Sequence, residues 1–367
     1  MELFTYRISD VFERFSSGKN ITESKIHESN NYPVYGGNGL RGFTDTYNFD
    51  GECILIGRQG AKCGNVRYFN GKGYMTDHAI VGVCKPDFST KFINYALSSL
   101  NLNRLSGQAA QPGLSVGMLK KQKILLPSFT NQTKIADIIY EYNNLIENNN
   151  RRIALLEKAA QELYKEWFVR FRFPGYETAE FENGIPKDWR VLPVKETFEI
   201  FDTERIPVSS MDRARMQKIY PYYGAAELMD YVDDYIFDGV YLLLGEDGSV
   251  MTPKGKPVLQ YVWGKFWVNN HAHVLQGKMP FSTEYLHLMF GQMDITGIVT
   301  GAAQPKISQG RLFKKKTIIP NLDLVKQFDE IIQPIYKIIR NLKESNQNLT
   351  KQRDLLLPRL MSGKLEV

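Results

Sequence analysis

The sequence contains a long internal repeat, which constrains the fold more than any other feature. The pentapeptide YPVYG at residues 32–36 recurs as YPYYG at residues 220–224. The same spacing places GRQG at residues 57–60 in register with GEDG at residues 245–248. Because repeated sequence at a fixed spacing predicts repeated structure, we expect two copies of one unit in tandem.

The repeat continues with a different spacing further along each copy. DHA at residues 77–79 corresponds to NHA at residues 270–272, and GQAAQP at residues 107–112 corresponds to TGAAQP at residues 300–305. These later motifs are 193 residues apart (300 minus 107), whereas the earlier ones are 188 apart (220 minus 32). The second copy is therefore expected to carry a loop insertion of about five residues.

Each copy begins with a β-rich part and ends in a long helix. Short apolar runs at residues 52–56 and 239–244 stand between Gly- and Asp-rich turns, which is typical of strands. Apolar residues then recur at alternating spacings of three and four, which predicts a coiled-coil seam of about four heptads in each copy. The seam residues are Ile139, Tyr142, Ile146, Asn149, Ile153, Leu156 and Leu163 in the first copy, and Ile332, Ile335, Ile339, Leu342, Leu349 and Leu356 in the second.

A heptad helix cannot bury its seam alone, and two arrangements compete. The helices could pair with each other inside the chain, or each could dimerise with another molecule. We favour antiparallel pairing inside the chain, which would place the two globular parts at opposite ends of a rod. A third possibility, that each seam only packs on its own sheet, is disfavoured by the regular heptads.

These patterns predict an α+β fold with pseudo-two-fold symmetry. Two tandem β-rich domains are each followed by a long helix, and the helices form an antiparallel coiled coil. The expected divisions are a first domain at 1–130, a helix at 131–173, a second domain at 174–323 that opens with a Pro/Gly-rich linker at 174–188, and a helix at 324–367.

Composition excludes several classes of protein. No stretch of about 18 uncharged apolar residues is present, so no membrane-spanning helix is expected. The three cysteines, Cys53, Cys63 and Cys84, form no C-x-x-C pair, which disfavours a zinc site and a disulfide framework and favours the reducing cytoplasm. The net charge of +6 permits an anionic partner without proving one.

In their order along the chain, the motifs resemble those of DNA specificity subunits of Type I restriction–modification systems. The motifs are YGGNG at 35–39, GRQG at 57–60, DHA at 77–79 and SGQAAQP at 106–112, followed by the helix. The segments 162–168 and 184–189 resemble the central junction of that family, and residues 355–363 resemble its C-terminal signature. The resemblance covers essentially the whole chain.

The resemblance implies a subunit that chooses the DNA site and catalyses nothing. It would recognise an asymmetric bipartite target and direct N6-adenine methylation and restriction by its partners. Those partners would be double-stranded DNA, two methyltransferase subunits docked in part on the helices, and restriction subunits as a further candidate. S-adenosylmethionine, ATP and magnesium would then belong to the partner subunits, and this chain would hold no cofactor or metal.

The sequence lacks the motifs that catalysis would need. It has no Walker A pattern, no H-E-x-x-H, and no methyltransferase Asn/Asp-Pro-Pro-aromatic motif. The glycine cluster at 36–39 is interpreted as a structural turn. His78 and His271 hold equivalent repeat positions, which favours a structural hydrogen bond over catalysis. A nuclease-like cluster of Asp50, Glu52 and Lys62 is disfavoured because Val240 replaces Glu52 in the second copy.

Specific DNA binding requires phosphate contacts for affinity and base contacts for discrimination. Basic residues recur beside the Gln-Pro motif in both copies and are the candidates for phosphate contact: Lys120, Lys121 and Lys123, and Arg311, Lys314, Lys315 and Lys316. Candidates for base reading are Arg41, Arg58, Gln59 and Gln108 in the first copy, and Lys254, Lys256 and Lys306 in the second. Lys62 is a further candidate for contact with DNA. Gln111 and Gln304 occupy the same repeat position, and two domains with different targets should differ where they read bases. We therefore interpret both as scaffold or phosphate contacts.

Two other functions remain open at this stage. One is a self-contained enzyme with a recognition module, against which the missing motifs argue. The other is a coiled-coil adaptor that binds only protein and has no affinity for DNA. If the chain is a specificity subunit, we also expect the paired helices to act as a ruler, which means that their length sets the gap between the two half-sites of the DNA target.

Overall fold

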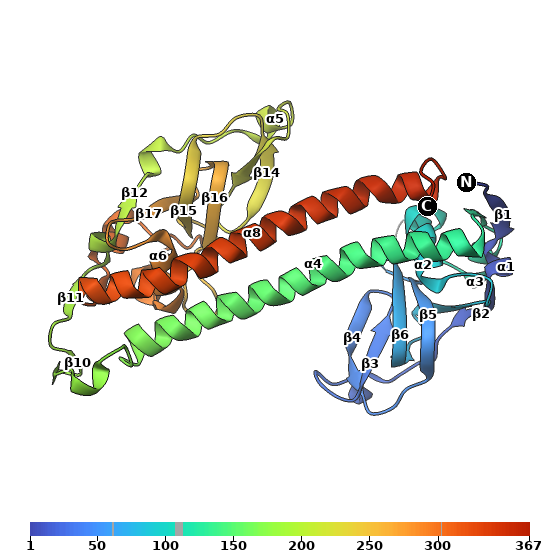
Figure 1. Cartoon of the computed structure of the whole chain (residues 1–367), viewed down its shortest axis with the longest axis horizontal. Coiled ribbons are helices and arrows are strands. Elements are labelled where there is room, and N and C mark those ends of the chain that lie inside the picture. The colour runs from blue at the N-terminus through green and yellow to red at the C-terminus, as the bar shows by residue number, and fades with distance from the viewer. Residues whose placement is uncertain (61, 107–112, 302) are drawn as a thin grey trace. The chain divides into compact units, whose positions relative to one another are not determined.

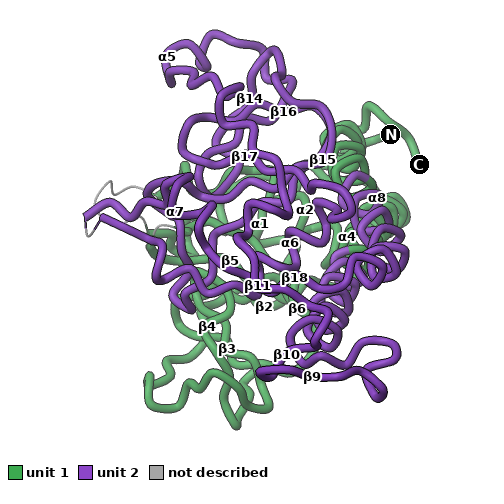
Figure 2. Tube along the Cα trace, turned by 90° about the vertical axis from the view of Figure 1, so that its left-hand side faces the viewer, with its two compact units in different colours: residues 1–149, 345–367 green, residues 150–344 purple. Residues whose placement is uncertain are grey.

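The computed structural model describes residues 1–60, 62–106, 113–301 and 303–367. The chain forms two compact units, one of Met1–Asn149 with Ser345–Val367 and the other of Asn150–Glu344 (Figure 2). The first is called unit 1 and the second unit 2. This division cuts across both long helices, so it does not test the boundaries expected along the chain, which remain predictions.

Unit 1 is built on a six-stranded sheet with the order β2-β7-β5-β6-β3-β4 (Figure 1). Every pairing in it is antiparallel except β3 with β6. A separate antiparallel pair joins β1 to β8. The elements are β1 (Phe4–Arg7), α1 (Ile8–Val11), β2 (Phe12–Ser17), η1 (Glu23–Lys25), β3 (Tyr32–Gly36), β4 (Gly39–Thr44), β5 (Phe49–Gly57), β6 (Val66–Met75), β7 (Ala79–Cys84), α2 (Thr90–Ser99), η2 (Leu102–Leu105), α3 (Val116–Lys120) and β8 (Lys123–Leu126).

Unit 2 repeats this topology strand for strand. Its sheet has the order β12-β17-β15-β16-β13-β14, its one parallel pairing joins β13 to β16, and β11 pairs with β18. The predicted duplication and the predicted strands at 52–56 and 239–244 are thereby confirmed. The elements are β11 (Arg190–Pro193), η5 (Val194–Thr197), β12 (Phe198–Ile200), η6 (Asp202–Glu204), α5 (Ser210–Arg213), β13 (Tyr220–Tyr223), β14 (Leu228–Val232), β15 (Phe237–Gly245), β16 (Leu259–Val268), β17 (Ala272–Gly277), α6 (Thr283–Gln292), η7 (Thr296–Ile298), α7 (Gln309–Lys314) and β18 (Lys316–Ile319).

Residues 53–56 of β5 are apolar without interruption because both faces of the sheet are covered there. In β5, Ile54 and Ile56 pack with α2 and with α4 of the same unit, whereas Cys53 and Leu55 pack against Phe69 and other residues on the opposite face. These four β5 side chains are at most 3% exposed. Since successive side chains of a strand point to opposite faces, one strand contributes to two cores, and each fully buried aliphatic side chain stabilises the unit by about 1.5–3 kcal/mol.

The long helices are α4 (Phe129–Tyr164), which ends in the π-helical turn η3 (Lys165–Val169), and α8 (Leu322–Met361). In unit 1, the Nη1 of Arg353 donates to the Oδ1 of Asn143 at 2.8 Å, and the Nδ2 of Asn149 donates to the Oδ1 of Asn346 at 2.9 Å. Residue numbers thus rise along α4 as they fall along α8. This is the antiparallel pairing inside the chain that the heptads predict.

Unit 2 shows the same antiparallel order by itself. Ile153 lies in one apolar cluster with Ile339 and Leu342. Further along α4, the ring of Tyr164 lies against that of Phe328, with centroids 5.9 Å apart. None of the helices in the described parts of the chain is long and apolar enough to cross a membrane.

The predicted seam residues divide into three groups. Ile153, Leu156, Ile335, Ile339 and Leu342 pack helix against helix. Others belong to the globular cores: Ile139 and Leu356 to that of unit 1, and Leu163 and Ile332 to that of unit 2, with Ile335 contacting it as well. Tyr142, Ile146, Asn149 and Leu349 are half-buried. Each heptad pattern therefore serves both for helix pairing and for docking the helix on a domain.

The Pro/Gly-rich linker contains a small hairpin in place of irregular chain. After η4 (Tyr176–Thr178), β9 (Phe181–Glu182) pairs antiparallel with β10 (Ile185–Pro186). Asn183 and Gly184 form the turn with φ of 52° and 79°. Both central residues of a type I′ turn need positive φ, which Asn and Gly adopt most readily.

Candidate nucleic-acid interface

Three loops converge at one edge of the sheet in unit 1. They follow β5, precede β7 and follow the Gln-Pro motif. The Arg58 amide donates to the His78 carbonyl at 3.0 Å, and the Leu114 amide donates to the Arg58 carbonyl at 2.8 Å. Gln59 forms an isolated β-bridge with Gly113. We call this arrangement the three-loop frame.

Unit 2 builds the same three-loop frame from equivalent positions. The Glu246 amide donates to the His271 carbonyl at 2.8 Å, and the Ile307 amide donates to the Glu246 carbonyl at 2.8 Å. Asp247 forms an isolated bridge with Lys306. The backbone of the frame is therefore the same in the two units, although the side chains at its outer edge differ.

Glycine is required where these loops approach one another in unit 1. A Cβ added to Gly57 would lie 2.5 Å from the Gly37 carbonyl oxygen, and one added to Gly37 would lie 2.9 Å from the His78 carbonyl oxygen. Gly36 and Gly39 also pair across the β3–β4 hairpin. The glycine cluster at 36–39 thus forms a structural turn packed under the frame, in agreement with its interpretation from the sequence.

The two repeat-equivalent histidines make equivalent side-chain contacts. The Nδ1 of His78 lies 3.0 Å from the Oε1 of Gln59, and the Nδ1 of His271 contacts the Oδ1 of Asp247. Each histidine therefore ties its own turn to the loop after β5 or β15, which is the structural role expected from the sequence. About half of each imidazole is exposed.

A buried ionic network supports the frame in unit 2. The carboxylate of Asp202 accepts from the Nδ1 of His273 at 2.6 Å and from the Nε2 of Gln309 at 2.6 Å. Arg205 lies 2.8 Å from the Oε2 of Glu246 and 3.4 Å from Asp202. The network joins η6, β17, α7 and the loop after β15 into one rigid block.

Unit 1 has no counterpart of this network at the equivalent described positions. The residue equivalent to His273 is Ile80, which is fully buried. The residue equivalent to Glu246 is Arg58, whose Nη1 donates to the Oγ of Ser17 at 3.3 Å. In unit 1 the loop after β5 is basic and packs above the apolar residue Ile80. In unit 2 the loop after β15 is acidic and packs above the ionic network of His273. The charge change in the loop is visible in the aligned motifs GRQG and GEDG. Asp202, Arg205 and Gln309 were not expected from the sequence, because nothing local in it marks their convergence.

Asp202, Glu246 and His273 are also the one group in the described residues whose ligand atoms could surround a metal ion. Arg205 already lies between the two carboxylates, and Lys306 lies 3.4 Å from Glu246. The Nε2 of His273 lies 2.8 Å from the Ile307 carbonyl, so both ring nitrogens face acceptors. The carboxylates and the imidazole therefore already have partners within the protein, and the cluster fits a structural ion-pair network.

The candidates for phosphate contact occupy matching places in the two units. Lys120 ends α3, Lys121 follows it, and Lys123 begins β8. Arg311 and Lys314 lie in α7, Lys315 follows it, and Lys316 begins β18. All of these residues are exposed except Lys315, which is half-buried. A short helix and a strand thus present a basic group beside the three-loop frame in each unit.

The candidates for base reading differ in exposure and in whether they already have a partner within the protein. Arg41 and Gln59 are exposed in unit 1, and Lys254 is exposed in unit 2. Lys62 and Gln304, which are candidates for other contacts with DNA, are exposed as well. Lys256 turns its ammonium to the Gln292 carbonyl, and Lys306 pairs with Glu246, so each would have to leave a partner to reach a base. Gln108 and Gln111 lie outside the described residues. All these assignments remain predictions.

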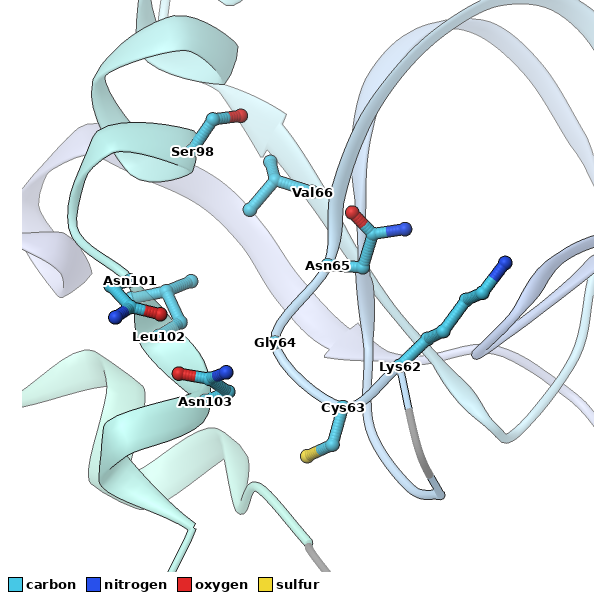
Figure 3. Close-up of a pocket in the computed structure, with 9 residues that line it drawn as sticks. All are labelled: Lys62, Cys63, Gly64, Asn65, Val66, Ser98, Asn101, Leu102 and Asn103. Carbon is cyan, nitrogen blue, oxygen red and sulfur yellow. The ribbon is translucent and has the colours of Figure 1, made fainter. Parts of the chain in front are cut away.

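A cavity of about 390 Å³ lies beside the loop that follows β5 (Figure 3). Its lining includes Lys62, Cys63, Asn65 and Asn103. Burial raises the pKa of the Cys63 thiol, despite a backbone contact with Leu114 that lowers it. A thiol with a raised pKa is a poor nucleophile at neutral pH, so Cys63 is not suited to nucleophilic catalysis in this cavity.

The described contacts do not support a nuclease-like cluster of Asp50, Glu52 and Lys62. Asp50 pairs with Lys72 at 3.8 Å, and Glu52 accepts a hydrogen bond from Tyr68. Each carboxylate therefore has its own partner on the neighbouring strand β6, and neither contacts Lys62.

The fold defines a class of protein with two similar sheet domains, each of which carries a frame of three loops and packs on the long helices. The family model of the Type I restriction modification DNA specificity domain matches this chain twice, at residues 2–158 and 186–351. The chain belongs to this family, whose specificity subunits are non-catalytic.

Curated relatives and solved structures agree with this assignment. The Type I restriction enzyme EcoprrI specificity subunit of Escherichia coli is 43% identical over 129 residues, covering 35% of this chain and 32% of that protein. The MjaIX specificity subunit of Methanocaldococcus jannaschii is 28% identical over 292 residues, covering 72% of this chain and 66% of that protein. The S subunit structure from M. genitalium matches with a TM-score of 0.72 at 16% identity, over 98% of this chain and 96% of that one, which shows a shared fold.

Proposed function

We propose that this chain chooses the DNA site for a Type I restriction–modification complex and performs no chemistry itself. The observation that carries the proposal is the three-loop frame, which is built twice on the same backbone hydrogen bonds with different side chains at its edge. A constant frame with changed side chains is what two readers of different half-sites require. The proposed target is therefore asymmetric and bipartite.

Affinity in this proposal comes from the exposed basic residues of α3, α7 and the strands after them. Contacts of lysine and arginine with phosphates release counterions, so binding should weaken steeply with salt. The acidic loop of unit 2 contributes nothing to phosphate attraction, and we propose base discrimination as its role in binding.

Catalysis is proposed to come from partner subunits. Two methyltransferase subunits would transfer methyl groups to adenine N6 from S-adenosylmethionine, and restriction subunits would use ATP and magnesium. The proposal also assigns the chain to the cytoplasm, in keeping with its three free cysteines.

The test is to sequence N6-methyladenine in DNA from cells that express this chain with its methyltransferase partner. We expect methylation at one bipartite asymmetric motif, and none when this chain is omitted. Methylation of a short continuous palindrome would contradict the proposal. If neither the purified chain nor its complex with the methyltransferase partner showed salt-dependent affinity for random duplex DNA, that result would favour the coiled-coil adaptor.

A further inference from the structure

At one position on the outer edge of the three-loop frame, the two units carry different side chains. In both units this side chain contacts the equivalent histidine. In unit 1 this is Gln59, and in unit 2 it is Asp247. Each follows the residue whose amide donates to the histidine carbonyl, and each bridges to the chain after the Gln-Pro motif. The backbone therefore presents the two side chains from equivalent places.

The histidine tether requires only one acceptor from this side chain. The Oε1 of Gln59 meets the Nδ1 of His78, and the Oδ1 of Asp247 meets the Nδ1 of His271. An amide oxygen and a carboxylate oxygen can each serve as that acceptor. The atoms left over are different, because glutamine keeps an NH₂ donor and aspartate keeps a second acceptor oxygen.

A purely structural role would not explain this exchange, since either residue would serve in both units. Gln59 is exposed, and 19% of the Asp247 side chain is exposed next to a half-exposed His271. A carboxylate at a DNA-binding edge repels phosphate, and the oxygen of Asp247 that His271 does not contact can accept a hydrogen bond only from a donor on the DNA. The amino groups of bases are such donors in the major groove.

We propose that positions 59 and 247 are specificity determinants, with the Gln59 amide reading adenine and the Asp247 carboxylate accepting from the amino group of cytosine. His78 and His271 are positioning residues that aim these side chains. The assignment follows from the pairing of glutamine with adenine N6 and N7, and of aspartate with cytosine N4. It rests on the proposed function.

Two exchanges that nearly preserve side-chain size and shape test the proposal: Gln59→Glu and Asp247→Asn. Each retains an acceptor for its histidine and changes only the outward atoms. The complex of each variant with its methyltransferase partner is measured on duplexes carrying all four bases at every position of the wild-type motif. Gln59→Glu should change the preference at one position of one half-site, from adenine towards cytosine. Asp247→Asn should change one position of the other half-site, from cytosine towards adenine.

The expected change in discrimination is roughly 5- to 150-fold, which corresponds to the 1–3 kcal/mol of one side-chain–base pair. Asn31→Asp and Asp323→Asn are matched controls, because they change the charge by the same amounts at exposed positions. They should leave both half-sites unchanged. Replacement of either histidine by phenylalanine should weaken discrimination at the same position without changing the preferred base.

The possible failures are distinguishable. A wild-type complex that methylates no bipartite motif would contradict the proposed function. A wild-type complex that does so, with variants that bind and keep every base preference, would overturn only the assignment of positions 59 and 247. A uniform loss of affinity over all bases would overturn it as well, because it would show a backbone contact.

Discussion

Asp202 is the residue on which most of the ionic support in unit 2 converges, and its carboxylate is 3% exposed. We expect Asp202→Asn to destabilise unit 2 by about 3–5 kcal/mol, because the loss of one partner leaves buried charges uncompensated. All four tryptophans lie in unit 2, so denaturant unfolding followed by tryptophan fluorescence reports on this unit. Asp323→Asn, at an exposed ion pair on α8, should change the transition little.

Asp202→Asn should also change how the free energy of unfolding of unit 2 depends on pH in the acid range. Burial alone would raise the pKa of Asp202, but hydrogen bonds from His273, Gln309 and the Val274 amide together lower it below its ordinary value. A carboxyl with a folded pKa below its unfolded value of about 3.9 stabilises the fold above that pH and loses this contribution as pH falls through the folded pKa. The difference between wild type and Asp202→Asn should therefore shrink as the pH falls below the unfolded pKa of about 3.9. A constant difference would show that the charge of Asp202 is not what stabilises the unit.

At the scale of elements, the Asn149–Asn346 hydrogen bond lies between α4 and α8 in unit 1. A polar pair in an apolar seam favours one register at a cost in stability. We expect a double-mutant cycle with Asn149→Ala and Asn346→Ala to give a coupling of about 0.5–1.5 kcal/mol in thermal unfolding followed by circular dichroism. The exposed pair Asn148→Ala and Gln347→Ala should show no coupling. Coupling of equal size in both cycles would argue against a role in register.

The periodicity of apolar residues predicted the two long helices and their pairing. It could not predict which surface each seam residue contacts, and the reason is physical. The two seams, at residues 139–163 and 332–356, were recognisable because helix pairing and docking on a domain both select apolar residues at the same spacing. For that reason the pattern could not show that Ile139 and Ile332 serve the globular cores while Ile153 and Ile339 meet across the helices.

The recognition surface was predictable only in part. The repeated motifs identified the loops of the frame, and the equivalence of His78 and His271 identified a structural contact. The partners of those histidines, and the approach of Arg205 to Glu246, depend on residues distant in sequence. Such contacts leave no periodic signal, so they become visible only when the sheet places its loops together.

At the scale of the whole molecule, the paired helices lead to a prediction about the DNA target. Deletion of residues 146–152 from α4 and 343–349 from α8 removes seven residues from each helix, so the heptad spacing on both sides is retained. Both members of the Asn149–Asn346 pair are removed together. Each helix shortens by about 10 Å, which corresponds to about three base pairs of DNA.

If the helices act as a ruler, the shortened protein should prefer a target whose gap is about three base pairs shorter. Affinity should also fall, because three base pairs turn the duplex by roughly 100° at 10–10.5 base pairs per turn. The measurement is methylation of a library of sites that differ only in gap length, by the complex with the methyltransferase partner. Deletion from α4 alone puts the two halves of the seam out of register and should abolish methylation at every gap. A paired deletion that folds, methylates and retains the original gap would show that something other than the helices sets the distance between half-sites.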